Sequence, residues 1–441
     1  MPQSLGKQKF IDMLSQAAIL LVLFAPVTYA INLGLLSHKG EPAGPYVTVV
    51  DLLALVFTAA FAITIIVKRE YRRLRIPPFA AIALFLWFAF GFFRITPEVQ
   101  VGKAGILKES LQVLEFLCFG FALFLTAMHD RRTVGLFLDT LTVAVTGVIG
   151  YGLYQYFSYD IPAFEVSSVL TNNSVLSAFL AISLPLVIAN SLSADTHARK
   201  AWALLLLLGS IPLVMNGWFL GALFISLGVF AGLYGRWFAL IGLFALLLLV
   251  AIIVPNLPRD NGGRLLETTQ LYHRLDNDDA RALMKTHVVS VRVRNWQAAL
   301  LAAADRPLLG YGPSSYSNAV RPNFYFDAKY TARTDDPTAF DIHVDEPSSF
   351  STYAVLLVEQ GVIGLLIFLS LIIAAIRWSL VACYCGKPVA VLGKGALCSL
   401  IALVISAQFT YVFDRGLAFV MVFTFALAFT VYEYARGYRE A

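Results

Sequence analysis

The sequence predicts an all-α polytopic membrane protein of about twelve transmembrane helices, with one large periplasmic loop subdomain. Hydrophobic residues make up 59% of the 441 residues and charged residues only 14%, which is more apolar surface than a soluble fold of this size buries. Apolar runs of about 18 to 24 residues recur along the chain. In hydrocarbon only helices and closed barrels satisfy every backbone polar group, and such unbroken runs exclude the alternating strands of a barrel.

Hydropathy and turn residues divide the apolar runs into individual spans. The predicted spans lie near 14–36, 47–67, 77–94, 109–128, 134–157, 169–193, 201–215, 217–234, 237–256, 350–376, 388–412 and 416–434. The first run has an alternative interpretation as a signal peptide ending near Ala30, because Lys7 and Lys9 precede it. A span is favoured, since the run is longer than a signal peptide needs and has no clean small-x-small cleavage site.

Basic residues predict the orientation of the spans. With the N-terminus in the cytoplasm, the inside segments hold seventeen Lys and Arg residues and the short outside segments hold five. Cytoplasmic loops carry the excess of Lys and Arg, so we expect both termini inside and the large loop outside. The basic residues lie in short clusters at span ends, which argues against a nucleic-acid-binding face.

The stretch 257–349 is predicted to face water, because it concentrates eleven of the 33 Lys and Arg residues and twelve of the 28 Asp and Glu residues. It separates an N-terminal bundle at 1–256, of about nine helices, from a C-terminal bundle at 350–441, of about three. Helix formers and first-turn acids predict a helix over 277–304. Pro307 and Gly310 end it, and the Pro-, Asp- and Ser-rich residues 313–349 suggest an ordered loop or short strands.

Several stretches around this loop form a recurring pattern. They are Leu170–Ser174 leading into Leu184–Leu186, Arg292–Trp296, Gly310–Pro313, and a span that begins Ser351–Tyr353 and continues Glu359–Leu365. Their order and spacing resemble the O-antigen ligase and polymerase superfamily, over about residues 165–375. Members join lipid-diphosphate-linked glycans to acceptors.

The resemblance implies glycan transfer at the periplasmic face of a bacterial inner membrane. The implied donor is an undecaprenyl-diphosphate-linked glycan. The implied acceptor is lipid A-core for a ligase or a second lipid-linked repeat unit for a polymerase, and polysaccharide assembly proteins are further partners. No cofactor is implied, and neither the four cysteines nor the loop has a persuasive disulfide or metal-ligand spacing.

Such a reaction needs cations that hold the diphosphate and stabilise its charge as the sugar leaves. The family places a diphosphate-binding arginine four residues before a tryptophan, and Arg292 has this spacing to Trp296. Residues four apart share a helix face, so Trp296 can anchor the helix while Arg292 faces the ligand. A solvated basic helix is the alternative. The substrate-binding candidates are Arg292, Arg294, Trp296, Gly310, Gly312, Asn172, Asn173 and Arg415.

The acceptor hydroxyl also needs a general base. The family carries a histidine eleven residues before the glycine that matches Gly361, and here this position is Phe350. The nearest substitutes are His343, Asp345 and Glu346, which we take as the catalytic candidates. An ordinary acidic loop is the alternative.

A second departure lies at the turn where the seventh and eighth spans meet on the outside, because Met215–Trp218 stands there in place of the family's Ser-Arg pair. Loss of both groups supports a second hypothesis, a non-catalytic member that binds lipid-linked glycan or scaffolds an assembly complex. Ionisable residues within spans, Glu115, Asp139 and Glu359, are further functional candidates. For Glu359 a helix-packing contact is favoured. A transporter would need discontinuous helices and internal repeats, which the sequence does not show.

Overall fold

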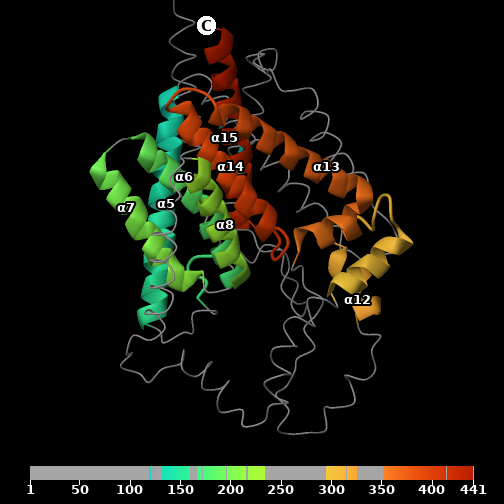
Figure 1. Cartoon of the computed structure of the whole chain (residues 1–441). Coiled ribbons are helices and arrows are strands. Elements are labelled where there is room, and N and C mark those ends of the chain that lie inside the picture. The colour runs from blue at the N-terminus through green and yellow to red at the C-terminus, as the bar shows by residue number, and fades with distance from the viewer. Residues whose placement is uncertain are drawn as a thin grey trace, which may run out of the picture.

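The structure is a computed structural model, and it describes residues 119–120, 123, 131–158, 166–170, 172–194, 196–214, 217–233, 295–313, 315–324, 351–413 and 415–440. In these ranges all regular structure is helical (Figure 1). The helices are α5 (Arg131–Ser158), α6 (Asn173–Ser193), α7 (His197–Ser210) with a 3₁₀ turn (Ile211–Leu213), α8 (Gly217–Leu233), α12 (Tyr316–Phe324), α13 (Thr352–Cys383), α14 (Val389–Ser406) and α15 (Arg415–Glu440). Residues 295–305 are also helical.

Five helical segments in the described residues are long and apolar enough to cross a membrane. They are Arg132–Ser158, Asn173–Ser193, Thr352–Cys383, Val389–Ser406 and Leu417–Gly437. These segments confirm the all-helical membrane class and the predicted spans that overlap them. The predicted spans 14–36, 47–67, 77–94, 109–128 and 237–256 lie wholly or almost wholly outside the described residues. The count of twelve therefore stays a prediction.

Helix α6 lies at the centre of the described bundle, between α5 and α14 (Figure 1). Most of its residues are buried, including Asn173, Ser177 and Ser183. Its closest neighbour is α14, which approaches so tightly that a Cβ added to Gly395 would lie 2.4 Å from the Ala189 Cβ. Small residues allow this approach, and they are what membrane helix interfaces favour in the absence of a hydrophobic driving force.

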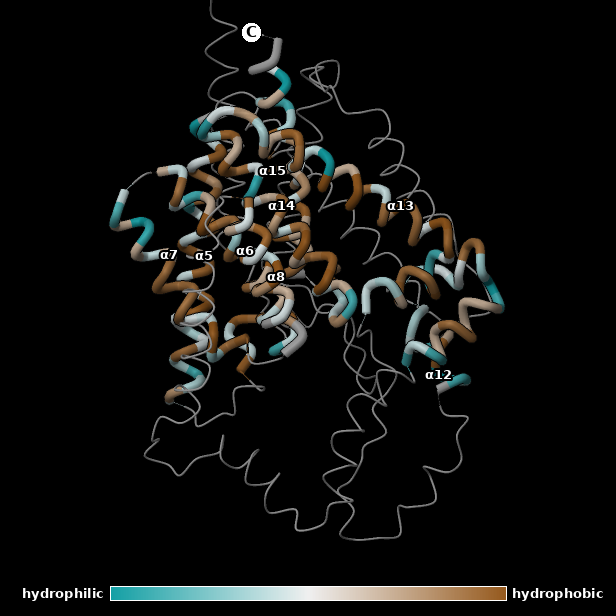
Figure 2. Tube along the Cα trace, in the orientation of Figure 1, coloured by the Kyte–Doolittle hydropathy of each residue, from teal (hydrophilic) through white to brown (hydrophobic). Residues whose placement is uncertain are grey.

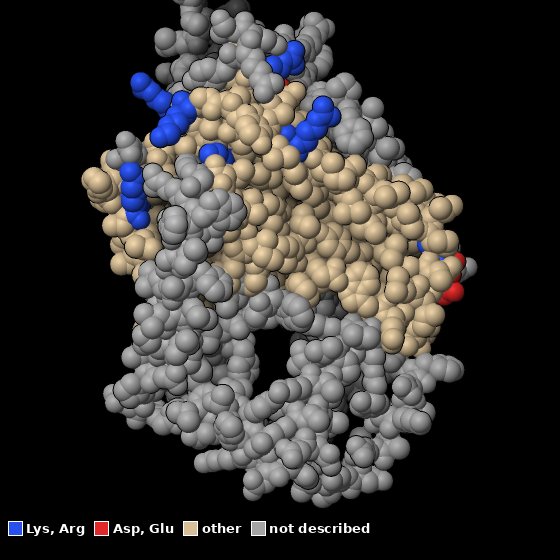
Figure 3. Space-filling model, in the orientation of Figure 1, with Lys and Arg blue, Asp and Glu red and all other residues tan. Residues whose placement is uncertain are grey.

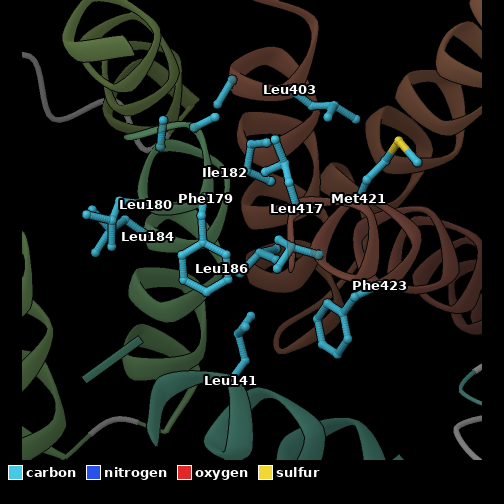
Figure 4. Close-up of a cluster of buried hydrophobic side chains, with 14 of the residues drawn as sticks. Leu141, Phe179, Leu180, Ile182, Leu184, Leu186, Leu403, Leu417, Met421 and Phe423 are labelled. Carbon is cyan, nitrogen blue, oxygen red and sulfur yellow. The ribbon is translucent and has the colours of Figure 1, made fainter. Parts of the chain in front are cut away.

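Apolar side chains from α5, α6, α14 and α15 meet in one core (Figure 4). Leu141, Phe179, Leu186, Leu403 and Phe423 are members of this core. One buried polar link crosses it, because the Ser399 hydroxyl of α14 donates to the Ile182 carbonyl of α6 at 2.7 Å. Such a hydroxyl keeps its hydrogen bond while two helices pack at close range.

Most Lys and Arg side chains visible on this face gather at the upper end of the bundle, and a broad uncharged band lies below them, with a few charged atoms at the lower right edge (Figure 3). Hydrophobic residues fill most of the long helices, and hydrophilic ones gather near helix ends (Figure 2). At the basic end, Arg199 of α7 binds Asp139 of α5 at 3.1 Å, and Lys394 donates to the last carbonyl of α8, Leu233, at 2.9 Å. Clustering at one end agrees with the predicted charge bias.

Asp139 links three helices at this end of the bundle. Its carboxylate accepts two hydrogen bonds from Arg199 and one, at 2.8 Å, from the Asn190 amide of α6. The contacts join α5, α6 and α7, so Asp139 has a structural role here. Glu115 lies outside the described residues.

The close α6–α14 contact generates a stability prediction. Gly395→Ala should lower the thermal unfolding temperature of the detergent-purified protein, because the added methyl overpacks against Ala189, a change that typically destabilises by about 1–3 kcal/mol. The control is Gly147→Ala in α5, where an added Cβ meets no atom within 4 Å. Equal unfolding temperatures for the two variants would contradict the tight packing.

Candidate functional site

The candidate site is built around a break in α13. Gly361 has φ 67° and ψ −170°, so the helix stops and restarts within one continuous apolar segment. The residues before the break, 352–360, form a separate short helix. A break removes intrahelical hydrogen bonds, and backbone groups left unpaired at membrane depth are strongly unfavourable.

Residues 307–312 supply the missing partners. The amides of Tyr311 and Gly312 donate to the carbonyls of Val358 and Glu359, both at 2.8 Å. In the other direction, the amides beyond the break donate to carbonyls of the loop, Val362 to Pro307 at 2.8 Å and Ile363 to Leu308 at 3.3 Å. We call this reciprocal pairing of 307–312 with 358–363 the backbone clamp.

The clamp requires glycine at two positions. Gly310 has φ 66°, and a Cβ there would lie 2.4 Å from the Val358 carbonyl oxygen. At Gly361 an added Cβ would lie 2.3 Å from the Leu308 oxygen. Both the left-handed conformation and the close approach exclude larger residues. The structure thus gives Gly310 a packing role, and its ligand-binding role stays a prediction, as does that of Gly312.

Glu359 extends the contact from backbone to side chain. It is only 6% exposed, and its Oε1 accepts a hydrogen bond from the Tyr316 amide at 3.0 Å. Tyr316 is the first residue of α12, so the carboxylate lies at a helix N-terminus, where the helix dipole favours negative charge. The predicted packing role of Glu359 is confirmed.

The expectation of a loop or short strands over 313–349 is wrong for Tyr316–Phe324, which forms α12 beside the first part of α13 (Figure 1). Pro322 lies inside this short helix and Ser315 precedes it. The composition favours a loop locally, but the acceptor that caps the helix comes from Glu359, 43 residues away. Tertiary contact outweighed local propensity.

The helical residues 295–305 confirm the last part of the helix predicted over 277–304 and its end before Pro307. Its alanines, Ala298, Ala299 and Ala302, form a second apolar core with α12 and with Ala354, Val355 and Val358 of α13. Trp296 packs against this core, as its predicted anchoring role requires. Arg292 and Arg294 lie outside the described residues.

The turn after this helix carries a small polar cluster. The Tyr311 hydroxyl donates to Asp305 at 3.1 Å, and the Arg306 guanidinium lies 4.9 Å from the centre of the Tyr311 ring. Burial and the Asp305 carboxylate raise the pKa of Tyr311, so its hydroxyl stays protonated and remains a donor.

The start of α13 is held to the turn between α14 and α15. The Thr352 amide donates to the carbonyls of Ala407 and Thr410, at 2.8 and 3.2 Å, and its hydroxyl donates to Thr410 at 2.7 Å. The same hydroxyl accepts from the Val412 amide at 2.9 Å. Thr352 is fully buried. Sequence reasoning missed this anchor, although Thr352 lies only two residues after the position of the family histidine.

Two predicted binding residues take part in backbone contacts. The Asn172 side chain caps α6 by accepting from the Val175 amide at 2.9 Å. The Asn173 amide is buried and donates to the carbonyls of Val166, at 2.8 Å, and Leu213, at 3.4 Å. These contacts are structural, and substrate binding by either residue stays a prediction.

The remaining predicted residues fall where the structure gives no side-chain description. His343, Asp345 and Glu346 lie outside the described residues, and of Arg415 only the helical backbone is described. Among the described side chains, no group of three or more His, Cys, Asp or Glu residues is placed to hold a metal ion.

A comparison with known families decides what this arrangement is related to. Residues 202–369 match the family model described as O-antigen ligase. This segment is similar to the O-antigen ligase family, the relationship that the order and spacing of the motifs predicted. The match runs from α7 to the second part of α13 and includes both sides of the backbone clamp. Among curated proteins, none matches the chain.

The O-antigen ligase family indicates a glycosyltransferase-like role in surface polysaccharide biosynthesis, with lipid-linked glycans as substrates. The matched segment ends at residue 369 in α13. It therefore includes the break at Gly361 and residues 307–312, which pair with it. We therefore take the clamp as the scaffold of the candidate site.

The clamp generates a prediction about Gly361. Gly361→Ala should reduce the yield of folded protein and its unfolding temperature, because the added methyl strikes the Leu308 carbonyl and the left-handed backbone alone disfavours alanine by about 1–2 kcal/mol. Gly228→Ala in α8, where an added Cβ meets nothing within 4 Å, is the matched control. A Gly361→Ala protein as stable as this control would disprove the clamp geometry.

A separate prediction concerns Glu359. Glu359→Gln keeps an oxygen that accepts from the Tyr316 amide, whereas Glu359→Leu removes it and should destabilise by about 1–3 kcal/mol. Hydrogen exchange of the α12 amides should therefore be faster in the leucine variant and near normal in the glutamine variant. Identical exchange in both variants would show that Glu359 does not hold α12.

Proposed function

We propose that this chain transfers glycan from an undecaprenyl-diphosphate-linked donor on the periplasmic face of the bacterial inner membrane. The proposal depends mainly on the family match over residues 202–369. The clamp supports it, because the clamp fixes helix 295–305, just downstream of Arg292 and Arg294, against the start of α13. The clamp thereby joins the helix that follows Arg292 and Arg294 in the sequence to the helix that follows position 350.

The proposed chemistry is an inverting, metal-independent substitution. The acceptor hydroxyl attacks the anomeric carbon, the bond from that carbon to the diphosphate oxygen breaks, and the diphosphate leaves with the electron pair. Arg292 and Arg294 stabilise the charge that develops on the leaving group. The acceptor proton passes to a base, for which His343, Asp345 and Glu346 are the proposed groups.

The acceptor is either lipid A-core, for a ligase, or a second lipid-linked repeat unit, for a polymerase. In the proposed arrangement residues 257–349 lie in the periplasm and both termini in the cytoplasm. The gathering of most visible basic residues at the upper end of the bundle in Figure 3 supports this orientation. The bundles at 1–256 and 350–441 flank the loop subdomain.

A second function is a member that binds lipid-linked glycan without transferring it. The observation that favours it is Phe350 at the position of the family histidine, together with Met215–Trp218 in place of the Ser-Arg pair. The decisive experiment incubates the purified protein with lipid-linked glycan and a panel of acceptors. Binding without transfer across the panel would favour this second function.

The donor site is tested by Arg292. Arg292→Ala should weaken use of the diphosphate-linked donor far more than Arg259→Ala or Arg333→Ala, because a charge-assisted contact is worth roughly 1.5–3 kcal/mol. Arg292→Lys should be partly defective, since lysine lacks the planar guanidinium fork. The measurement is donor turnover at matched expression. Equal activity in all four variants would remove Arg292 from the site.

The base is tested in the 343–346 segment. His343→Ala, or else Glu346→Gln, should lower turnover by about two to four orders of magnitude without loss of donor binding, the range of a positioned acid–base group. Phe350→Ala should affect stability more than chemistry. If substitutions at His343, Asp345 and Glu346 all leave transfer unchanged, the base lies elsewhere.

A further inference from the structure

Asn295 is a buried side chain whose polar atoms have no visible use in the fold. It is 3% exposed, and neither its Nδ2 nor its Oδ1 has a hydrogen-bond partner among the residues that the structure describes. An unpaired buried amide destabilises a protein, because both atoms lose their hydrogen bonds to water. The stability of the fold therefore does not explain why an asparagine occupies this position.

The position of Asn295 on its helix makes it more unusual. Residues 298, 299 and 302 follow at helical spacing on the same face, and all three are buried alanines that pack in the second core. Gln297, on another face, is exposed. An apolar residue would continue the packed face at position 295 without any unsatisfied atom.

Other buried polar atoms without partners in the described residues include the hydroxyls of Ser183, Ser379 and Ser406. All three lie in long apolar helices. Asn295 differs in two respects, since it leaves two separate polar atoms unpaired where each serine leaves one, and it lies in the segment between two spans that we propose to be periplasmic.

The chemistry of the amide indicates what it can bind. Nδ2 only donates and Oδ1 only accepts, so a full partner must present both an acceptor and a donor. Sugar hydroxyls and acetamido groups do so. Phosphate oxygens in the ionised diphosphate only accept, and they would leave Oδ1 unpaired.

We propose that Asn295 binds the sugar of the lipid-linked glycan, through a hydroxyl or acetamido group near the diphosphate. This inference rests on the proposed function and assigns the glycan, not the diphosphate, to Asn295. In the sequence it follows Arg294 directly, so the sugar contact is adjacent to the proposed diphosphate contacts. Because the side chain is only 3% exposed, the glycan must displace the atoms that cover it.

Such a contact makes Asn295 a specificity residue. A buried polar group built to pair with a substrate hydroxyl discriminates strongly against analogues that lack this hydroxyl, because the amide is then left unpaired. Donors whose first sugar lacks the group should bind more weakly, although their lipid and diphosphate are unchanged.

The test compares Asn295→Leu, which is close in shape but has no polar atom, with Gln297→Leu on the exposed face of the same helix. Two probes are used with detergent-purified full-length protein: undecaprenyl-diphosphate-linked repeat unit and undecaprenyl diphosphate without sugar. We expect Asn295→Leu to unfold at the same or a higher temperature and to weaken binding of the glycosylated probe at least tenfold. Binding of the sugar-free probe should not change, and Gln297→Leu should match the unmodified protein with both probes.

Three results would overturn the proposal. A lower unfolding temperature for Asn295→Leu would show that the amide is used structurally. Equal loss with both probes would make it a diphosphate contact, and unchanged binding of the glycosylated probe would leave it without a ligand. Failure of the unmodified protein to bind either probe is a different outcome, because it would reject the proposed function itself.

Discussion

Pairing of backbone groups is the constraint on which the described structure depends. Away from water an N–H or C=O without a partner is strongly unfavourable, so a helix that breaks inside protein needs partners from another segment. At Gly361 residues 307–312 do so, and the interrupted α13 is thereby tied to the segment that precedes it. The second apolar core and the cap of α12 by Glu359 follow from the same meeting of segments. One local interruption thus organises the part of the chain where the candidate site lies.

The sequence predicted well those features that depend on a single segment. Apolar runs located α5, α6, α13, α14 and α15, with starts within four residues and ends within seven, because the length of a span is set by the bilayer. The Pro307–Gly310 stretch correctly ended the helix before it. Helix α12 was missed, since its N-terminal acceptor is contributed by Glu359 and its packing by α13. Composition carries no information about such distant partners.

At the candidate site, too, the sequence predicted features of single segments but not the contacts between distant ones. The order of motifs around the loop indicated the family, which the match over 202–369 supports, and Trp296 packs as an anchor should. Gly310, Thr352 and Asn173 make contacts with residues far away in the chain, so the motifs that contain them did not reveal these contacts. Asn295 was overlooked because an asparagine beside two arginines reads as an ordinary polar residue. Only its burial distinguishes it.

The backbone clamp also has a consequence for biogenesis. Residues 307–312 are synthesised about 50 residues before their partners at 358–363, a long separation for contacts that complete a membrane helix. On the proposed orientation, residues 307–312 enter the translocation machinery before α13 does. The translocation machinery therefore delivers the acceptors and donors for the break ahead of the helix that needs them. Residues 358–363 can then fold against residues 307–312, which are already present. The order of translation therefore helps α13 to adopt its interrupted form.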